Sequence, residues 1–310
     1  MRSSLSLKLM NFSSIRRANF SKFENRTSDV SDLHSINEAI NAKAGRKLLP
    51  SILVGLTLIA LVWLTLAYAR VLFAVLVATA VALGIREIAR AFSAVGTQIS
   101  MRLLILATLG LTYATWIAGV EGLAIATAIA LPVLLISRLR KGPQDFVKSA
   151  TATTLALIYL PFLAGFLVLL GRPDDGLARV MTFVVLVGCN DTFGYLVGVM
   201  FGRHPLVPAI SPKKSWEGLV GSIIFTAIGG ALSFHYILDL HWWIGALVAL
   251  MIVFTATSGD LIESAMKRDL SLKDMGSLLP GHGGMLDRLD SVLISAPALY
   301  LALELVKRFS

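Results

Sequence analysis

The chain has 310 residues, of which 56% are hydrophobic and 15% are charged, with a mean hydropathy of +0.76 and a formal net charge of +9. A soluble domain is roughly 45 to 50% apolar, so this composition excludes an ordinary soluble protein and predicts an integral membrane protein. The single cysteine, Cys189, excludes an internal disulfide, and its apolar surroundings favour a packed thiol over a reactive one.

Residues 1–47 are polar, rich in Ser, Asn and Arg, and weakly patterned, which predicts a disordered or surface-lying cytoplasmic tail. The stretch up to Lys22 contains no acid, as in a transit peptide. No apolar core of the signal-peptide type precedes the first apolar run, so a secretory signal is not indicated.

The apolar runs that follow predict an all-α, polytopic integral membrane protein with about nine transmembrane helices, taking about 20 residues for each crossing. The runs lie near residues 48–68, 71–87, 102–120, 122–138, 150–171, 178–201, 218–238, 242–259 and 289–307. The first two runs are so closely spaced that a hairpin is an alternative to two full crossings.

The distribution of Lys and Arg predicts a cytoplasmic N-terminus, because positive charge near the ends of spans collects on the cytoplasmic side. With that orientation the outside keeps only Arg70, Arg172, Arg179, Lys307 and Arg308. We therefore expect a multi-pass protein of the cell (inner) membrane. The excess positive charge is mainly a topology signal and secondarily an attraction to anionic headgroups or phosphates; it does not indicate nucleic acid as a partner.

Polar residues divide the membrane region in two. Residues 48–171 have almost no ionisable residue within their apolar runs and are expected to be transmembrane scaffold helices. Residues 172–310 are expected to be a transmembrane catalytic region with cytoplasmic active-site loops. Asp191 lies inside the run 178–201, and an Asp within a membrane span indicates function. The alternative is that Asp191 and Asn190 only hydrogen-bond across helices.

Three glycines follow Asp191 at four-residue spacing, namely Gly194, Gly198 and Gly202. Small residues at this spacing form a helix face that a neighbouring helix can approach closely.

The segment SPKKS between two spans predicts a short cationic turn that leads into a helix. Lys213, Lys214 and Ser215 would place ammonium and hydroxyl groups beside free backbone N–H groups, which suits a multiply charged phosphate. The alternative is a topology anchor with Trp216 at the membrane interface. No Walker A or GxGxxG pattern is present, so a soluble nucleotide-binding fold is not supported.

The segment SGDLIESAMKRD places Asp260, Glu263, Ser264 and Lys267 on one helix face through spacings of three and four residues. That stripe could hold a metal and a phosphate together, with Arg268 next to it. The alternative is a solvated helix end that carries a Glu263–Lys267 pair.

The segment LLPGHGGMLDRLD joins a glycine-rich turn to two carboxylates at the start of the last apolar run. Asp287 and Asp290 are three residues apart, so both point to one face, and Arg288 points away from them. Carboxylates beside apolar runs need a positive partner. We predict that Asp260, Asp287 and Asp290 bind Mg²⁺, which prefers hard oxygen ligands and bridges to substrate phosphates.

The glycines of this turn would allow the backbone to approach a ligand around His282. We therefore assign His282, Gly283 and Gly284 to the reacting pocket. His282 could orient the substrate or transfer a proton, and these two roles stay open at the level of sequence.

Residues 264–290, SAMKRDLSLKDMGSLLPGHGGMLDRLD, resemble the signature of the phosphatidate cytidylyltransferase family, also called CDP-diacylglycerol synthases, in spacing and in residue type. SPKKSWEG, CNDTFGYLVG and SGDLIES resemble further blocks of that family. The resemblance covers roughly residues 170 to 310, whereas the first five spans match in general hydropathy only. Ser215 stands where many members have Thr, which keeps the hydroxyl group.

The resemblance implies that CTP and phosphatidate are the substrates and that CDP-diacylglycerol and pyrophosphate are the products. It also implies dependence on Mg²⁺, with Asp260 and Asp287 at the metal positions and Asp290 completing the pair. A second, monovalent cation and a homo-oligomer are left open. The residues assigned to substrate phosphates and nucleotide are Lys213, Lys214, Ser215, Lys267, Arg268, Arg288 and Asp191.

Two other readings remain. A CTP-dependent polyprenol or dolichol kinase would need the same membrane helices, metal and cationic site, but it would transfer the terminal phosphoryl group of CTP. A non-enzymatic transporter could use Asp191 and the nearby glycines as a substrate path, but it would not need clustered carboxylates beside a glycine-rich loop.

Overall fold

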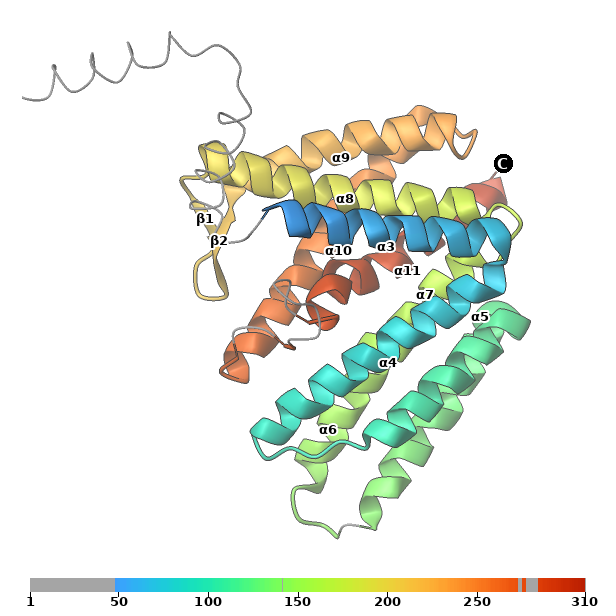
Figure 1. Cartoon of the computed structure of the whole chain (residues 1–310), viewed down its shortest axis with the longest axis vertical. Coiled ribbons are helices and arrows are strands. Elements are labelled where there is room, and N and C mark those ends of the chain that lie inside the picture. Colours follow the sequence, from blue (N-terminus) through green and yellow to red (C-terminus); the bar gives the residue numbers. More distant parts are fainter. Residues whose placement is uncertain (1–47, 141, 273–274, 277–283, 310) are drawn as a thin grey trace, which may run out of the picture. The chain divides into compact units, whose positions relative to one another are not determined.

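The computed structural model describes residues 48–140, 142–272, 275–276 and 284–309. The chain divides into two units, Met1–Leu53 and Val54–Ser310, and every predicted site residue belongs to the second. The predicted tail 1–47 lies outside the described residues. The elements of the structure are α3 (Leu48–Tyr68), α4 (Arg70–Ala94), α5 (Met101–Leu139), α6 (Phe146–Leu157), η1 (Ile158–Phe162), α7 (Leu163–Gly171), α8 (Gly176–Phe201), β1 (Pro205–Val207), β2 (Ser211–Ser215), α9 (Trp216–Tyr236), α10 (Trp242–Asp269) and α11 (Leu286–Phe309) (Figure 1).

The described part of the chain is almost entirely helical, and seven of its helices are long and apolar enough to cross a membrane. They are α4, α5, the continuous segment Phe146–Gly171, and α8 to α11. Large apolar side chains such as Leu106, Ile125 and Ile136 are exposed on the outside of these helices. Lipid tails would cover such side chains, and each helix satisfies its own backbone groups, as a bilayer requires. The protein is therefore an all-α, multi-pass membrane protein.

The predicted count of nine spans is not confirmed: the runs 102–120 and 122–138 belong to the single element α5, and of the run 48–68 only the shorter apolar stretch Gly55–Tyr68 is counted. A straight helix of its 39 residues would be about 58 Å long, nearly twice the hydrocarbon thickness. The element is interrupted at Gly119, which has φ 65° and ψ −139°. Leu111 and Leu123, one from each half, lie in the same hydrophobic cluster. The left-handed glycine thus turns the second half back toward the first.

The predicted span 150–171 forms without interruption, but its central turn is a π-helix. This turn, η1, contains Pro161, which has no backbone N–H to donate. A single π turn accommodates the missing hydrogen bond and also changes which side chains face the neighbouring helices. Tyr159, in the same turn, is directed into the protein interior and is 3% exposed.

Close contacts between glycine-lined helix faces hold the C-terminal helices together. A Cβ atom added at Gly218 of α9 would lie 2.7 Å from the carbonyl oxygen of Gly194 of α8. A Cβ at Gly230 of α9 would lie 2.4 Å from the carbonyl oxygen of Gly245 of α10. Backbone approach of this kind is how membrane helices gain packing energy. The prediction that the glycines after Asp191 admit a neighbouring helix is therefore confirmed for α8 and α9.

The scaffold and catalytic regions share one hydrophobic core. Leu157 and Leu160 of the scaffold belong to the same buried cluster as Leu286 and Leu293 of α11. Helix α11 packs against α7 and α4 as well as against α10. Residues 172–310 therefore pack on the helices of residues 62–171, and the assignment of catalysis to the C-terminal part stays a prediction.

The segment 211–215 forms a β-strand where the sequence predicted a turn. Strand β2 pairs with β1 in an antiparallel two-stranded sheet, with Pro205 opposite Ser215. The backbone N–H of Trp216 donates to the carbonyl of His204 at 3.0 Å. This pairing satisfies backbone N–H and C=O groups that an isolated turn would leave without partners. The backbone that carries Lys213 and Lys214 is therefore fixed by the strand pairing.

Candidate active site

Helices α10 and α11 approach each other closely beside the predicted acidic residues. A Cβ atom added at Gly259 would lie 2.5 Å from the carbonyl oxygen of Asp290 and 3.1 Å from the Cα of Ser291. Only a glycine lets the two backbones meet at this distance. The contact places Asp260, the residue after Gly259, beside the helix that carries Asp290.

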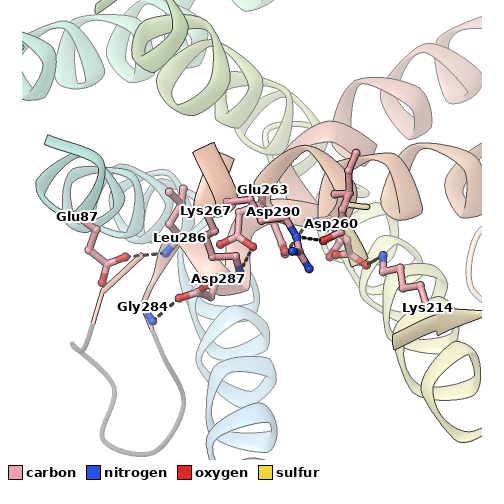
Figure 2. Close-up of polar contacts among 12 residues, drawn as sticks. Glu87, Lys214, Asp260, Glu263, Lys267, Gly284, Leu286, Asp287 and Asp290 are labelled. Atoms are coloured by element: carbon pink, nitrogen blue, oxygen red, sulfur yellow. Dashed lines mark hydrogen bonds and ion pairs between the residues drawn. The ribbon is translucent and has the colours of Figure 1, made fainter. Parts of the chain in front are cut away.

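Lys267 joins two carboxylates from different helices at the centre of the site (Figure 2). Its ammonium group contacts Glu263 one turn earlier on α10 and lies 2.8 Å from Oδ1 of Asp287 on α11. Glu263 is only 1% exposed. The pair Glu263–Lys267 thus forms, but it is buried and linked to Asp287, which differs from the solvated helix end considered as an alternative. Sequence analysis placed Glu263 on the helix face that could hold a metal and a phosphate, but gave it no role of its own beyond a pair with Lys267.

Asp287 is held from two sides at the beginning of α11. Its Oδ2 accepts a hydrogen bond of 2.7 Å from the backbone N–H of Gly284, and its Oδ1 receives the Lys267 contact. The first backbone N–H groups of a helix have no partner within the helix and carry partial positive charge. A carboxylate at this position is therefore favoured even in a half-buried setting.

Lys214 brings the cationic strand to the acidic residues. Its ammonium group forms an ion pair with Asp260 of α10 (Figure 2). The neighbouring Lys213 is exposed. The hydroxyl of Ser215 accepts the backbone N–H of Gly218 at 3.1 Å and so caps α9. The structure thus gives these three predicted phosphate ligands different surroundings, and Lys214 alone contacts the acidic cluster.

Asp191 reaches the same region from α8. Its Oδ1 accepts a hydrogen bond of 2.9 Å from the amide of Asn190, and its Oδ2 lies 3.4 Å from the hydroxyl of Ser291. The alternative of hydrogen bonding across helices is realised, but its partner is the residue next to Asp290. The charges of Asp191, Asp260 and Glu263 all act on Asp290. Four acidic residues from three helices therefore share one neighbourhood.

The remaining predicted residues are placed as follows. Arg268 is exposed and donates from its Nε to the carbonyl oxygen of Ile210 in the β1–β2 loop. Arg288 lies in the first turns of α11 and is half-buried. His282 and Gly283 lie outside the described residues, so their assignment stays a prediction.

Oxygen atoms without a partner remain in the neighbourhood of these carboxylates. Within the described ranges, Oε1 of Glu263, Oδ1 of Asn190 and the hydroxyl of Tyr159 are buried and have no hydrogen-bond partner. Tyr159 lies within electrostatic range of the carboxyl groups of Asp290, Glu263 and Asp260. Buried acceptors without partners call for a donor or a cation. Tyr159 was missed by sequence analysis, because one aromatic residue in an apolar run has no distinguishing pattern.

The three predicted metal ligands do not form a complete ligand set by themselves. Nowhere in residues 48–140, 142–272, 275–276 and 284–309 are three or more His, Cys, Asp or Glu side chains grouped so that they could hold a metal ion. Asp260 and Asp287 each contact a different lysine. The site as built can bind phosphates through its lysines, and can offer one or two carboxylates at a time to a cation.

One further acidic residue enters this region from the scaffold. Glu87 of α4 is buried and accepts hydrogen bonds from the backbone at the start of α11 (Figure 2). Sequence analysis placed it at the end of a scaffold span. The signal that could have identified it is an isolated acid at the end of an apolar run, between Arg86 and Arg90.

Comparison with known proteins decides the family. The model of the cytidylyltransferase family matches residues 50–306. The chain belongs to this family. A phosphatidate cytidylyltransferase of Mycobacterium leprae is 37% identical over 280 residues, covering 85% of this chain and 90% of the relative. One of Mycobacterium bovis is 34% identical over 278 residues, covering 86% and 91%. One of Thermotoga maritima is 35% identical over 176 residues, covering 54% and 64%.

Membership of the cytidylyltransferase family extends over both halves of the chain, whereas the motif resemblance covered only the C-terminal half. The protein is therefore a nucleotidyltransferase, and the family match includes the helices before residue 171 as well as those after it.

Proposed function

We propose that this membrane-embedded cytidylyltransferase makes CDP-diacylglycerol and pyrophosphate from CTP and phosphatidate. Its relatives from Mycobacterium leprae and Mycobacterium bovis are named phosphatidate cytidylyltransferases, which supports the proposal. The observation that carries the proposal is the meeting of three distant motifs at one site. Lys214 contacts Asp260, and Lys267 contacts Asp287, so β2, α10 and α11 converge.

The reaction is an in-line displacement at phosphorus. A phosphate oxygen of phosphatidate attacks the α-phosphorus of CTP, the new P–O bond forms, and the bond from the α-phosphorus to the bridging oxygen breaks. Pyrophosphate leaves with that electron pair. A phosphate monoester is already ionised near neutral pH, so the protein supplies positioning and neutralisation of charge rather than a strong base.

Lysine side chains carry most of that work. Lys214 and Lys267 lie beside the carboxylates and can exchange a carboxylate contact for a substrate phosphate oxygen, because both are strong acceptors for an ammonium group. Lys213 and Arg268 lie at the exposed rim, where they attract polyanionic substrates. The lysine–carboxylate contacts also neutralise the charges of both partners, which stabilises the arrangement of the site before the substrates bind.

The donor set suits Mg²⁺ bound together with substrate. This ion takes one or two carboxylates and completes its octahedron with water and phosphate oxygens. Asp260 and Asp287, with Asp290 beside them, would hold it, and Oε1 of Glu263 is a further buried carboxylate oxygen without a hydrogen-bond partner in the described structure. When bound, Mg²⁺ would neutralise phosphate charge and orient the leaving group.

The site faces the cytoplasm, in the inner membrane, in this proposal. Support comes from the concentration of Lys and Arg on the side of the motif loops, and from CTP being a cytoplasmic nucleotide. The acyl chains of phosphatidate stay in the bilayer, and the headgroup enters among helices α8 to α11.

The decisive experiment uses the purified protein in detergent with phosphatidate and Mg²⁺. With α-labelled CTP we expect label in the lipid product, and with γ-labelled CTP we expect label in pyrophosphate only. A chelator should abolish both. Label in the lipid from γ-labelled CTP would identify a polyprenol-kinase type of reaction, and no turnover with any CTP would remove the enzymatic proposal.

A further inference from the structure

Glu87 is a buried acid that lies outside every functional motif. It belongs to α4 and is 4% exposed. Its Oε1 accepts a hydrogen bond of 2.9 Å from the backbone N–H of Met285, and its Oε2 accepts one of 2.8 Å from that of Leu286. Figure 2 shows the contact with Leu286. A buried carboxylate is expensive unless it is fully hydrogen-bonded. The carboxylate of Glu87 meets this requirement with two backbone N–H groups at one place in the chain, which indicates that it holds this backbone in position.

Two glycines make room for this carboxylate. A Cβ atom added at Gly276 would lie 2.3 Å from Oε1 of Glu87, and one added at Gly284 would lie 2.5 Å from Oε2. Any side chain at either position would displace the carboxylate from its two hydrogen bonds. The backbone thus approaches Glu87 from two positions that are eight residues apart along the chain.

The contact lies one residue from the catalytic machinery. The N–H groups of Met285 and Leu286 belong to the start of α11, where backbone donors have no partner within the helix. A negative charge at this end of a helix is also favourable. The next residue is Asp287, which receives the backbone N–H of Gly284 and the ammonium group of Lys267.

We propose that Glu87 is a positioning residue: it fixes the first turn of α11 against α4 and thereby holds Asp287 in contact with Lys267. Its catalytic consequence rests on the proposed function. The anchoring itself does not, because it follows from the hydrogen bonds and the glycine contacts alone. Glu87 is the point at which the scaffold determines the geometry of the catalytic residues.

The first test replaces Glu87 by a side chain of equal size. Glu87→Gln keeps the shape but removes the charge and one acceptor, because the amide nitrogen of Gln cannot accept an N–H. A small displacement of a catalytic group costs up to about 10²-fold in rate, so we expect kcat to fall by about 10- to 100-fold. The KM for CTP should change by less than about twofold, because Glu87 does not touch substrate. Glu121→Gln, at an exposed position of α5, is the matched control and should behave as wild type.

The second test displaces the Glu87 carboxylate by changing a glycine that contacts it. Gly276→Ala should displace Glu87 and reproduce the kcat defect, whereas Gly110→Ala, where nothing lies within 4 Å of the added Cβ, should not. Because both changes break one contact, the double variant Glu87→Gln with Gly276→Ala should be no worse than the more severe single variant. Additive effects would contradict a shared mechanism.

Hydrogen–deuterium exchange at the N-terminus of α11 separates this inference from the proposed function. In Glu87→Gln the amides of Met285 and Leu286 should exchange faster, with exchange in the middle of α11 unchanged. Faster exchange together with a lower kcat supports the inference. Unchanged exchange, or faster exchange with normal kcat, overturns it. If the wild type shows no cytidylyl transfer, the proposed function fails, and the exchange result still decides the anchoring.

Discussion

Single residues at the centre of this site combine two tasks. Lys267 contacts Glu263 and Asp287, and Lys214 contacts Asp260, so each cation neutralises an acid, and in the proposed reaction it would also bind a substrate phosphate. Paired charges lower the penalty for placing these groups in a poorly hydrated region. Removing one partner leaves the other without compensation, so charge-neutralising substitutions should have large effects.

Asp287→Asn and Asp260→Asn test the carboxylates. Each keeps the side-chain shape and removes the charge, and we expect kcat to fall on the order of 10²- to 10⁴-fold by analogy with other groups that stabilise charge in the transition state. The measurement is Mg²⁺-dependent formation of CDP-lipid from CTP. Asp174→Asn, at a fully exposed position, is the control. Near-normal turnover in both variants would remove these residues from the reaction.

Lys214→Ala and Lys213→Ala test whether the two adjacent lysines differ. Only Lys214 contacts the acidic cluster, so its loss should lower kcat/KM for CTP by about 10- to 100-fold, the value of one charge-assisted hydrogen bond. Lys213 is exposed, and its loss should have a smaller effect that weakens as salt increases. Equal CTP kinetics in Lys214→Ala and wild type would leave that lysine with a topological role only.

At the scale of the elements, glycine contacts determine how the catalytic helices meet. Because Gly259 has no side chain, the backbone of Asp290 on α11 can contact α10. Gly218 in the same way allows the backbone of Gly194 on α8 to contact α9. Strand β2 extends directly from the start of α9, so the separation of α8 and α9 also affects where Lys214 lies. The acidic and basic residues are brought together by backbone approach as much as by their own attraction.

Gly218→Ala tests this packing. The added Cβ would lie 2.7 Å from a backbone oxygen of Gly194, which cannot move without shifting α8. Overpacking of this kind costs about 1–3 kcal/mol, so the melting temperature in detergent should fall and activity should fall with it. Gly188→Ala adds the same atom in open space on α8 and should leave both unchanged. A wild-type melting temperature for Gly218→Ala would show that the contact is not tight.

The whole molecule depends on an interface between its two halves. Helix α11 carries Asp287 and Asp290, yet it packs against α7 and α4 of the scaffold. The hydrophobic cluster is continuous across residues 48–171 and 172–310. The scaffold therefore supplies the fixed surface on which the catalytic turn is held, which is a more direct role than burial in lipid alone.

The orientation in the membrane is a prediction at the same scale. In a Cys189→Ala background, Arg203→Cys should react with a membrane-impermeant maleimide only when the cytoplasmic face is accessible. Asp174→Cys, in the loop between α7 and α8, should react from the opposite face. Both positions are exposed, so access to each depends on the membrane alone. The reverse labelling pattern would place the site outside the cytoplasm and contradict the proposed topology.

Much of the fold could be predicted from sequence because lipid-spanning helices are encoded locally. Each long apolar run forms a helix close to its predicted position, and the acidic motifs lie at helix ends where they were expected. The predicted boundary between the runs 102–120 and 122–138 lies next to the break at Gly119, although both halves belong to the one element α5. Strand β2 was missed because its partner, β1, has no strand pattern of its own.

Hydropathy and motif spacing are properties of consecutive residues, so the membrane character and the cytidylyltransferase signature could be predicted from the chain alone. The polar contacts of the site could not be predicted in this way: Lys214 with Asp260, Lys267 with Asp287, and Glu87 with the start of α11. The Glu87 contact joins residues 199 positions apart. Such pairings depend on where packed helices place their ends, and no local pattern in the chain encodes that.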